Sequence, residues 1–190
     1  MKEVADVIAK ARTLSSIASV AVFFLATVSV VALAFYDYVA VRPQLPRIER
    51  ILAQADPLDA NPPEAIRRLI DASMGSPTVH ATRLVTVRFY AGLSPGERHL
   101  RNALWSLLLP LHLGKDKMYG LYATLAFNGR DQGLSRYAAR EYGKPLDRLS
   151  PNEAAATVEM TRMPSIYRRN PDKLAQRAAA LASKAEKASE

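Results

Sequence analysis

The chain has no cysteine among its 190 residues. Disulfide scaffolds, thiolate zinc sites and cysteine nucleophiles are therefore excluded, because each of them needs a thiol. Its histidines, His80, His99 and His112, show no metal-ligand spacing, so no metal centre is predicted. No glycine-rich phosphate loop occurs, and neither Ser94 nor Ser135 has the surroundings of a nucleophile elbow.

Charge is missing from a long stretch near the N-terminus, since no Asp, Glu, Lys or Arg occurs in residues 13–36. A bilayer needs about 20 apolar residues in a helix, and this run is long enough. It is longer than the roughly 7–15 apolar residues of a signal peptide. An uncleaved transmembrane anchor over 13–36 is therefore predicted, although Ala32-Leu33-Ala34 resembles a signal-peptidase site.

Basic residues lie on both sides of this run. Lys2, Lys10 and Arg12 precede it, which predicts a cytoplasmic N-terminus over residues 1–12. Arg42, Arg47 and Arg50 follow it and reduce the charge difference across the run. The rest of the chain is expected on the opposite side of the membrane.

The net charge of +8 favours anionic partners such as nucleic acid, lipid headgroups or a pyrophosphate-linked substrate. A solvated basic surface with no such partner gives the same charge. The basic segment after Arg168 lacks interleaved aromatic residues and any nucleic-acid-binding motif, so nucleic acid is not expected as a partner.

Helix signals dominate the rest of the chain and predict an all-α domain over residues 47–180. A proline-containing linker is expected at 37–46 and a charged tail at 181–190. The stretch 80–90 alternates like a strand but is predicted as helix from its surroundings. Pro110 is expected to kink or stop one helix, and the next is expected over 115–127. Helices are further predicted over 47–55, from Pro63, over 134–142, from Ser150 and from Asn170.

The segment from Gly133 to Pro171 carries an ordered set of motif residues. They are Gly133, Ala138, Ala139, Tyr142, Gly143 and Lys144, then Leu149, Ser150, Glu153, Ala154 and Ala155, then Pro164, Tyr167, Asn170 and Pro171. In order and spacing this resembles the end of the peptidoglycan glycosyltransferase domain, glycosyltransferase family 51. The resemblance implies a lysozyme-like fold behind a membrane anchor.

The resemblance continues upstream in weaker form. Arg98-His99-Leu100-Arg101-Asn102 stands where the family has R-K-x-x-E, and Lys115 to Thr124 where it has K-x-x-I-L-E-x-Y-L-N. Residues 77–84 correspond to its G-S-T-I-T-Q-Q-L, and Gln54-Ala55-Asp56 to the A-E-D of its first catalytic motif. The resemblance covers roughly residues 45–180.

The family joins a sugar hydroxyl to a lipid-pyrophosphate-linked glycan, which requires a carboxylate base worth roughly 10²–10⁴-fold in rate. In this chain the family's glutamates are replaced by Ala55, Asn102 and Gly120. None of these side chains accepts a proton at neutral pH, so the resemblance implies impaired catalysis. Thr124 replaces the family's Asn, and Thr82 and Arg83 replace its two glutamines.

Basic residues of the family's motifs are retained. Arg98, Arg101 and Lys115 are the predicted substrate-binding residues, because guanidinium and ammonium groups bind pyrophosphate oxygens. No catalytic residue is assigned. Asp56 is the candidate substitute base, with Asp59 and Asp71 as further carboxylates. No cofactor is predicted, although an active enzyme would call for a divalent cation.

Three hypotheses follow. The first is a catalytically impaired glycosyltransferase-like protein in the bacterial inner membrane, single-pass and facing the periplasm. It would bind lipid-linked precursor, nascent glycan or a cell-wall synthase partner. The second is an active enzyme with a relocated carboxylate base, and the third is a membrane-anchored helical interaction protein.

Overall fold

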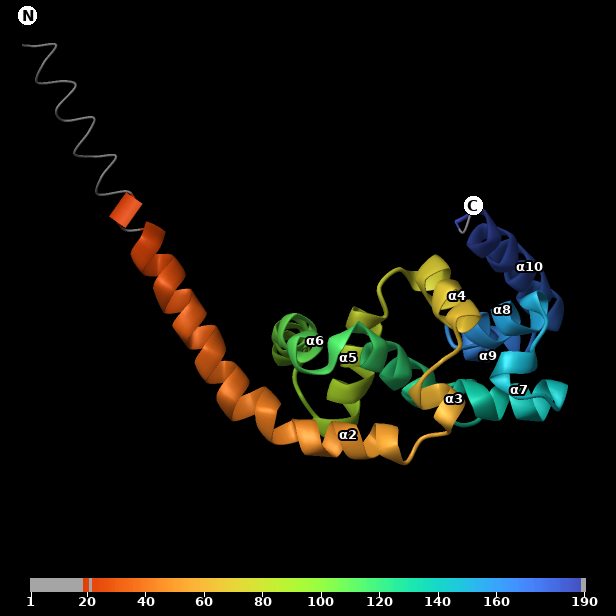
Figure 1. Cartoon of the computed structure of the whole chain (residues 1–190), viewed down its shortest axis with the longest axis horizontal. Coiled ribbons are helices and arrows are strands. Elements are labelled where there is room, and N and C mark those ends of the chain that lie inside the picture. Colours follow the sequence, from red (N-terminus) through yellow and green to blue (C-terminus); the bar gives the residue numbers. More distant parts are fainter. Residues whose placement is uncertain (1–18, 21, 189–190) are drawn as a thin grey trace, which may run out of the picture. The chain divides into compact units, whose positions relative to one another are not determined.

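The computed structural model describes residues 19–20 and 22–188 (Figure 1). Within these residues all regular secondary structure is helical, apart from an isolated β-bridge between Phe127 and Gln132. The all-α class predicted from the sequence is confirmed. The chain divides into two compact units, Met1–Gln44 and Leu45–Glu190.

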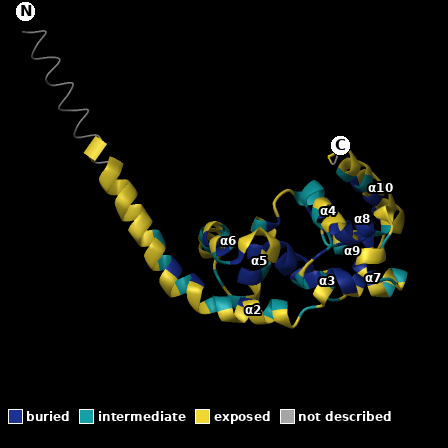
Figure 2. Cartoon of the chain, in the orientation of Figure 1, coloured by how far each residue is buried: buried dark blue, intermediate teal, exposed yellow. Residues whose placement is uncertain are grey.

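The first unit is helical at every residue that the structure describes. Residues 22–36 form α-helix, which continues as η1 (Asp37–Val41, a π-helix) and η2 (Arg42–Gln44, a 3₁₀-helix). Most of its apolar side chains are exposed, for example Phe23 at 75%, and the helix is mostly yellow in Figure 2, whereas Val41 near its end is buried. The expected cytoplasmic segment 1–12 and the start of the expected anchor lie outside the described residues.

A helix over Val22–Ala53 is long and apolar enough to cross a membrane, judged by its length and composition. The prediction of one N-terminal apolar helix is therefore confirmed. The residues of the expected linker, 37–46, are helical throughout, and the boundary between the two units lies among them. Pro46 causes no break because it lies in the first turn of a helix, where its missing N–H has no partner to lose.

The second unit contains the remaining helices, whose bounds are as follows. They are α2 (Leu45–Ala53), α3 (Pro57–Ala60), α4 (Glu64–Met74), α5 (Pro77–Phe89), α6 (Pro95–Leu125), α7 (Leu134–Tyr142), η3 (Leu146–Arg148), α8 (Pro151–Met160), α9 (Pro164–Tyr167) and α10 (Pro171–Lys187). The stretch 80–90 is helix as predicted. Residues 181–187 of the expected charged tail belong to α10, and residues 189–190 lie outside the described residues.

Two groups of helices share the core of this unit. In one, α5 packs along α6, and in the other α4, α8 and α10 pack on one another. Trp105 of α6 is fully buried and meets the ring of Tyr90 edge-on, as expected for a core residue. Short α3 contacts both α6 and α7 and so links segments far apart in the sequence.

Capping residues explain where several of these helices begin and end. Ser150 and Glu153 form a capping box at α8, which confirms the predicted helix start. Asn170 caps α10 through the N–H of Lys173. Gly143 ends α7 in the left-handed conformation that glycine adopts without a Cβ clash.

The break in α6 differs from the prediction. The helix continues through Pro110, and its backbone leaves helical geometry at Gly114, with φ 72° and ψ 168°. A positive φ of this size favours glycine, so the break lies at the residue that tolerates it. The second half of α6 then runs from Lys115, where a new helix was predicted.

Candidate functional site: the Asp71 cleft

A cleft of about 870 Å³ opens between the end of α4, the exposed face of α5, the end of α6 and the turn after α8. We call it the Asp71 cleft. Its polar lining residues include Asp71, Ser73, His80, Arg83, Tyr122, Thr161, Arg162 and Lys184. Its apolar lining residues include Leu84, Val87 and Phe127.

The apolar side chains of the cleft come mainly from α5 and the residues that follow α6. Val87 is 55% exposed and Phe127 46% exposed, so both present apolar surface to a ligand. Arg83 lies one turn before Val87 on the same helix. The cleft therefore combines an apolar wall with positive charge, which suits a ligand that has both an apolar and an anionic part.

Two side chains at the start of the second half of α6, Tyr119 and Lys115, hold the Asp71 carboxylate. Its Oδ2 accepts a hydrogen bond of 2.5 Å from the Tyr119 hydroxyl and lies 3.6 Å from Lys115 Nζ. Its Oδ1 is buried and has no hydrogen-bond partner in the described part of the chain. A buried acceptor without a donor is uncommon in folded proteins, and an ordered water is the kind of donor that usually satisfies such a group.

The same contacts shift the pKa values of the two residues that hold Asp71. The pKa of Lys115 is raised, first by its hydrogen bond with Tyr119 and then by the charge of Asp71. Burial, with the hydrogen bond to Asp71, raises the pKa of Tyr119. Lys115 is therefore cationic and Tyr119 a neutral donor at pH 7.

Two of the cleft's cations hold the end of α4. Arg162 Nη1 donates to the carbonyl of Ser73 at 3.1 Å, and Lys184 Nζ donates to the carbonyl of Ala72 at 2.6 Å. The last carbonyls of a helix lack intrahelical partners, and cations near them are stabilising. Arg162 and Lys184 thus each use a hydrogen-bond donor on this helix end.

Arg83 is the cation of the cleft best placed for a ligand. Across the described ranges, its guanidinium makes no hydrogen bond or ion pair. The nearby His80 has its pKa lowered by burial first and then by the charges of Arg83 and Arg162. His80 is therefore neutral at pH 7 and adds no charge to that of Arg83.

Glu159 lies beside the cleft and is a carboxylate that sequence reasoning missed. It is 2% exposed and accepts hydrogen bonds from Ser73 Oγ at 2.8 Å and Tyr167 Oη at 3.3 Å. Its Oε1 also lies 3.4 Å from Arg162 Nη1. A buried carboxylate needs such partners, so Glu159 joins α8 to α4 and α9. Its position in the stretch Ala154–Met160, where Thr157 is the other polar residue, is the signal that the sequence offers.

The predicted substrate-binding residues do not gather in one place. Arg98 donates to the carbonyl of Leu93, and the Arg101 guanidinium lies 3.9 Å from the centroid of the Tyr90 ring. Lys115 pairs with Asp71 instead. Helical rise of roughly 1.5 Å per residue places Arg98 about 22 Å from Leu113, just before Lys115. Only Lys115 contacts a residue of the Asp71 cleft.

The predicted substitute base, Asp56, takes part in a helix-capping cluster. Its Oδ1 accepts from the Leu58 N–H at 2.9 Å and from Ser135 Oγ at 3.0 Å. Asp59 Oδ1 accepts from both the N–H and the hydroxyl of Ser135. Asp56 lines a separate hollow of about 270 Å³ with Lys144. Its role as a base stays a prediction, while its described contacts join α3 to α7.

The residues that stand at the family's motif positions make contacts within the fold. Asn102 accepts a hydrogen bond from the Thr86 hydroxyl. A Cβ on Gly120 would lie 2.2 Å from the carbonyl oxygen of Ala60. Thr82 and Thr124 each bury a hydroxyl that has no partner in the part of the chain described.

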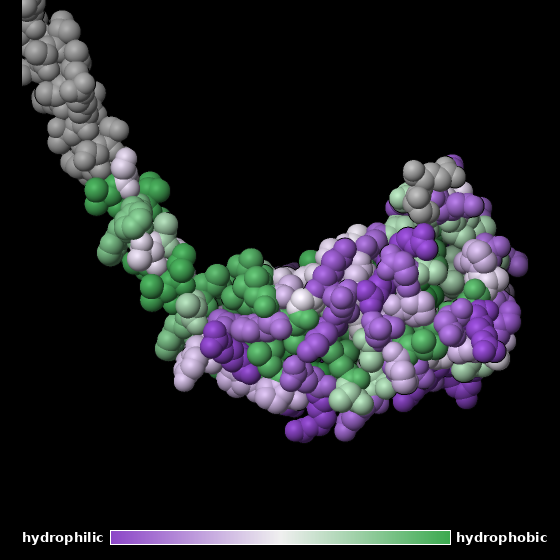
Figure 3. All heavy atoms as spheres, in the orientation of Figure 1, coloured by the Kyte–Doolittle hydropathy of each residue, from purple (hydrophilic) through white to green (hydrophobic). Residues whose placement is uncertain are grey.

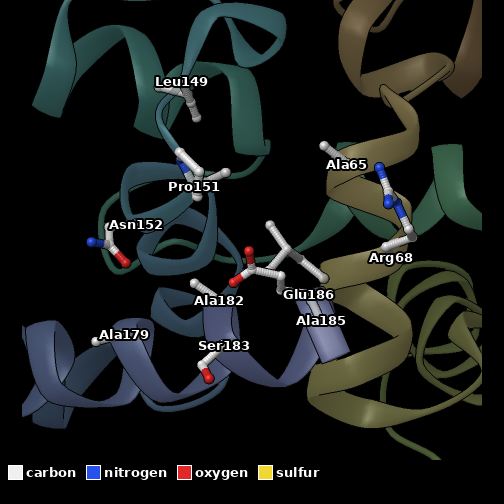
Figure 4. A pocket seen from close by; sticks show the side chains of 12 residues that line it. Ala65, Arg68, Leu149, Pro151, Asn152, Ala179, Ala182, Ser183, Ala185 and Glu186 are labelled. Atoms are coloured by element: carbon white, nitrogen blue, oxygen red, sulfur yellow. The ribbon is translucent and has the colours of Figure 1, made fainter. Parts of the chain in front are cut away.

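A second hollow, of about 510 Å³, lies between α4, α8 and α10 (Figure 4). Small side chains such as Ala179 and Ala182 of α10 line much of it, together with Arg68 and Glu186. It offers few polar groups for ligand recognition. We therefore treat the Asp71 cleft as the candidate site.

Within the described residues, no group of three or more His, Asp or Glu side chains is placed to hold a metal ion. The divalent cation belongs to the hypothesis of an active enzyme with a relocated base, and it stays a prediction. The chain matches no protein-family model, no curated protein and no solved structure.

Proposed function

We propose that this protein is a membrane-anchored, peptidoglycan glycosyltransferase-like protein that binds lipid-linked cell-wall precursor or nascent glycan without efficient catalysis. The second unit would have the lysozyme-like organisation of that family. It would face the periplasm from the bacterial inner membrane. A cell-wall synthase is the corresponding protein partner.

The Asp71 cleft is the observation that carries this proposal. A lipid-linked pyrophosphate precursor has an apolar chain, an anionic pyrophosphate and sugar hydroxyls. The cleft offers Val87 and Phe127 to the first, Arg83 to the second and the partly exposed Asp71 carboxylate to the third. Charge-assisted hydrogen bonds from Arg to phosphate oxygens are the strongest of these interactions.

Impaired catalysis is supported by the residues at the family's glutamate positions. Ala55 and Gly120 carry no polar side chain, and the Asn102 amide is already paired with Thr86. Proton abstraction requires a base within hydrogen-bond reach of the attacking hydroxyl. Binding needs no such base, so a binding role is compatible with all three replacements.

Binding of labelled lipid II to the full chain in detergent tests this proposal. Arg83→Gln removes the cleft's uncommitted cation, and we expect affinity to fall by roughly 10-fold or more, as for loss of a charged hydrogen bond. Arg88→Gln is the matched control. Arg88 lies on the same helix and donates to Gln132 outside the cleft, so its loss should leave affinity unchanged. Equal affinities for wild type and Arg83→Gln would contradict the cleft as the binding site.

A second candidate function is an active enzyme with a relocated base. Asp71 favours it, because this carboxylate lines the cleft and has one oxygen without a partner. Polymerisation of lipid II by the wild type would support this alternative. Asp71→Asn should then abolish turnover if Asp71 is the base, whereas Asp56→Asn should abolish it if Asp56 is.

A further inference from the structure

A separate hollow of about 330 Å³ lies between the turn after α6, α7, the end of α8 and the residues that join α9 to α10. We call it the turn hollow. Among the described residues, none lines both this hollow and the Asp71 cleft. Three arginines line it, Arg130, Arg140 and Arg168, together with one carboxylate, Glu141. Figure 3 shows hydrophilic side chains at the surface over this end of the second unit, near α7.

The base of the turn hollow is apolar and aromatic. Tyr137, Met160 and Tyr167 line it and are 4%, 5% and 3% exposed. Leu174 of α10 lines it too and is 8% exposed. The arginines Arg130 and Arg168, by contrast, are exposed. Small-molecule sites typically combine an apolar lining of this kind with a few polar groups that fix the ligand's orientation.

The turn that carries Arg130 is held in one geometry by Asn128, which is 1% exposed. Asn128 Oδ1 accepts hydrogen bonds of 3.2 Å from the N–H groups of Arg130 and Asp131. Its Nδ2 donates to the carbonyl of Gly133 at 2.9 Å. A ligand would therefore meet a preformed turn, so binding would order little additional backbone.

Arg140 supports this turn and has few donors left for a ligand. Its Nη1 donates to Asp131 at 3.1 Å and its Nε to Glu141 at 2.8 Å. Its Nη2 lies 3.4 Å from Asn128 Oδ1. Two carboxylates thus balance the charge of Arg140, which leaves Arg130 and Arg168 as the cations available to a ligand.

Arg168 is positioned by the turn and keeps free donors. Its Nη1 donates to the carbonyl of Gly129 at 2.8 Å, while its Nε and Nη2 make no hydrogen bond within the described residues. Gly129 has a φ of 94°, and a Cβ there would lie 2.9 Å from Arg168 Cδ. Glycine therefore lets the Arg168 side chain lie against the turn. The Arg130 guanidinium makes no hydrogen bond or ion pair with the part of the chain described.

Two available guanidinium groups beside an apolar base indicate the chemistry of the ligand. Guanidinium binds carboxylate oxygens bidentately. Glu141 on the same lining repels a doubly charged phosphate monoester more than a singly charged carboxylate. The volume of about 330 Å³ lies at the lower end of the range for small-ligand sites, so it suits one apolar group with its carboxylate.

We infer that the turn hollow binds a carboxylate carried on a small apolar group. The carboxylate oxygens accept hydrogen bonds from Arg130 and Arg168, and the apolar group lies against Met160 and Leu174. A free apolar acid and the last residue of a peptide chain share this chemistry. The inference does not depend on the proposed function, because it uses no residue of the Asp71 cleft.

Fluorescence anisotropy of a labelled peptide tests this inference on the full chain in detergent. The probe is Gly-Ser-Gly-Leu with a dye on its amino group and a free carboxylate at its end. We expect it to bind roughly 10-fold or more tightly than the same peptide with a terminal amide, because the amide loses charge-assisted hydrogen bonds. Equal binding of acid and amide would overturn the inference.

Arg168→Gln should weaken binding of the acid by roughly 10-fold or more. Arg169→Gln is the matched control, because it removes the same charge from the next residue, which is exposed and does not line the hollow. Gly129→Ala keeps every charge but displaces the Arg168 side chain, so it should also weaken binding. Equal losses for Arg168→Gln and Arg169→Gln would overturn the inference, because they would indicate unspecific attraction to a basic surface. If circular dichroism shows that Gly129→Ala does not fold, the two arginine variants decide.

N-acetyl-leucine as a competitor distinguishes the two sources of the carboxylate. Displacement of the probe by N-acetyl-leucine would identify a free acid as sufficient. Displacement by the unlabelled peptide alone would identify the end of a chain. Either result supports the inference, whereas no displacement by either compound would overturn it. Arg83→Gln should leave binding of the peptide unchanged, so failure here and failure of lipid II binding at the Asp71 cleft are separate results.

Discussion

Gly120 shows how packing at one residue can rule out a catalytic side chain. The motif of glycosyltransferase family 51, which this segment resembles, has glutamate at this position. Here a Cβ would lie 2.2 Å from the carbonyl oxygen and 3.0 Å from the carbonyl carbon of Ala60, which belong to the backbone of α3. No side-chain rotation relieves a contact with backbone, so α3 can approach α6 this closely only across a glycine.

Gly120→Ala is therefore expected to lower the free energy of unfolding by about 1–3 kcal/mol, the usual range for overpacking. Gly96→Ala in the first turn of the same helix is the control. A Cβ there meets nothing within 4 Å, so stability should be unchanged or slightly higher. Denaturation in detergent, followed by circular dichroism, measures both. A Gly120→Ala protein as stable as wild type would show that α3 moves aside at little cost.

Asp59 makes stability depend on pH. Burial is the main reason that its pKa rises from 3.8 to about 6. The folded state thus holds the proton more tightly than the unfolded state does, so the free energy of unfolding falls as pH rises from about 4 to about 6. A difference of this size corresponds to about 3 kcal/mol as an order of magnitude.

Asp59→Asn should flatten this part of the stability profile. The amide oxygen can still accept from the Ser135 N–H, while the charged form that burial disfavours no longer exists. Denaturant unfolding of both proteins at pH 4.5 and pH 7 provides the comparison. If the variant loses as much stability as wild type over this interval, other groups cause the dependence.

At the scale of elements, the start of α8 depends on its capping box. Ser150 Oγ accepts from the Glu153 N–H, and Glu153 in turn accepts from the Ser150 N–H and from Lys144. Ser150→Ala should reduce the free energy of unfolding by about 1 kcal/mol. Ser183→Ala within α10 is a control that should cost nothing, because alanine is the better helix former. Equal melting temperatures for Ser150→Ala and wild type would contradict this role.

The helices that the sequence predicted well are those with local signals at their ends. α7 was predicted with its observed bounds, Leu134–Tyr142, because Gly133 and Gly143 flank it. Pro110 was a misleading signal. A proline removes only one hydrogen bond, and the α6 segment around it has strong support from the core through Trp105 and Leu109. The helical geometry of 37–46 was missed because its prolines fall where a helix tolerates them.

The candidate site could be predicted only in part, because it depends on long-range packing. Asp71, Arg83, Arg162 and Lys184 come from four helices or turns and meet only in the folded unit. The sequence identified Lys115 and named Asp71 as one of several carboxylates. It could not show that Arg98 and Lys115 lie far apart along α6. The contacts of Glu159 with Ser73 join residues 86 positions apart and have no local signal.

At the scale of the whole molecule, two properties are combined in one chain. An apolar helix of membrane-spanning length precedes a helical unit whose cleft has both an apolar wall and an uncommitted cation. A lipid-linked anionic ligand would be presented to such a cleft from the membrane itself. Under the proposed function, the residues at 55, 102 and 120 would allow binding without turnover.

The most direct test of this central claim measures both properties of the wild-type protein in the same vesicles. Labelled lipid II is supplied at saturating concentration, and bound lipid and polymerised glycan are measured together, with and without a divalent cation. The account predicts binding that Arg83→Gln weakens, with no glycan chains formed. Polymerisation at a rate typical of the family, or no binding at all, would contradict it.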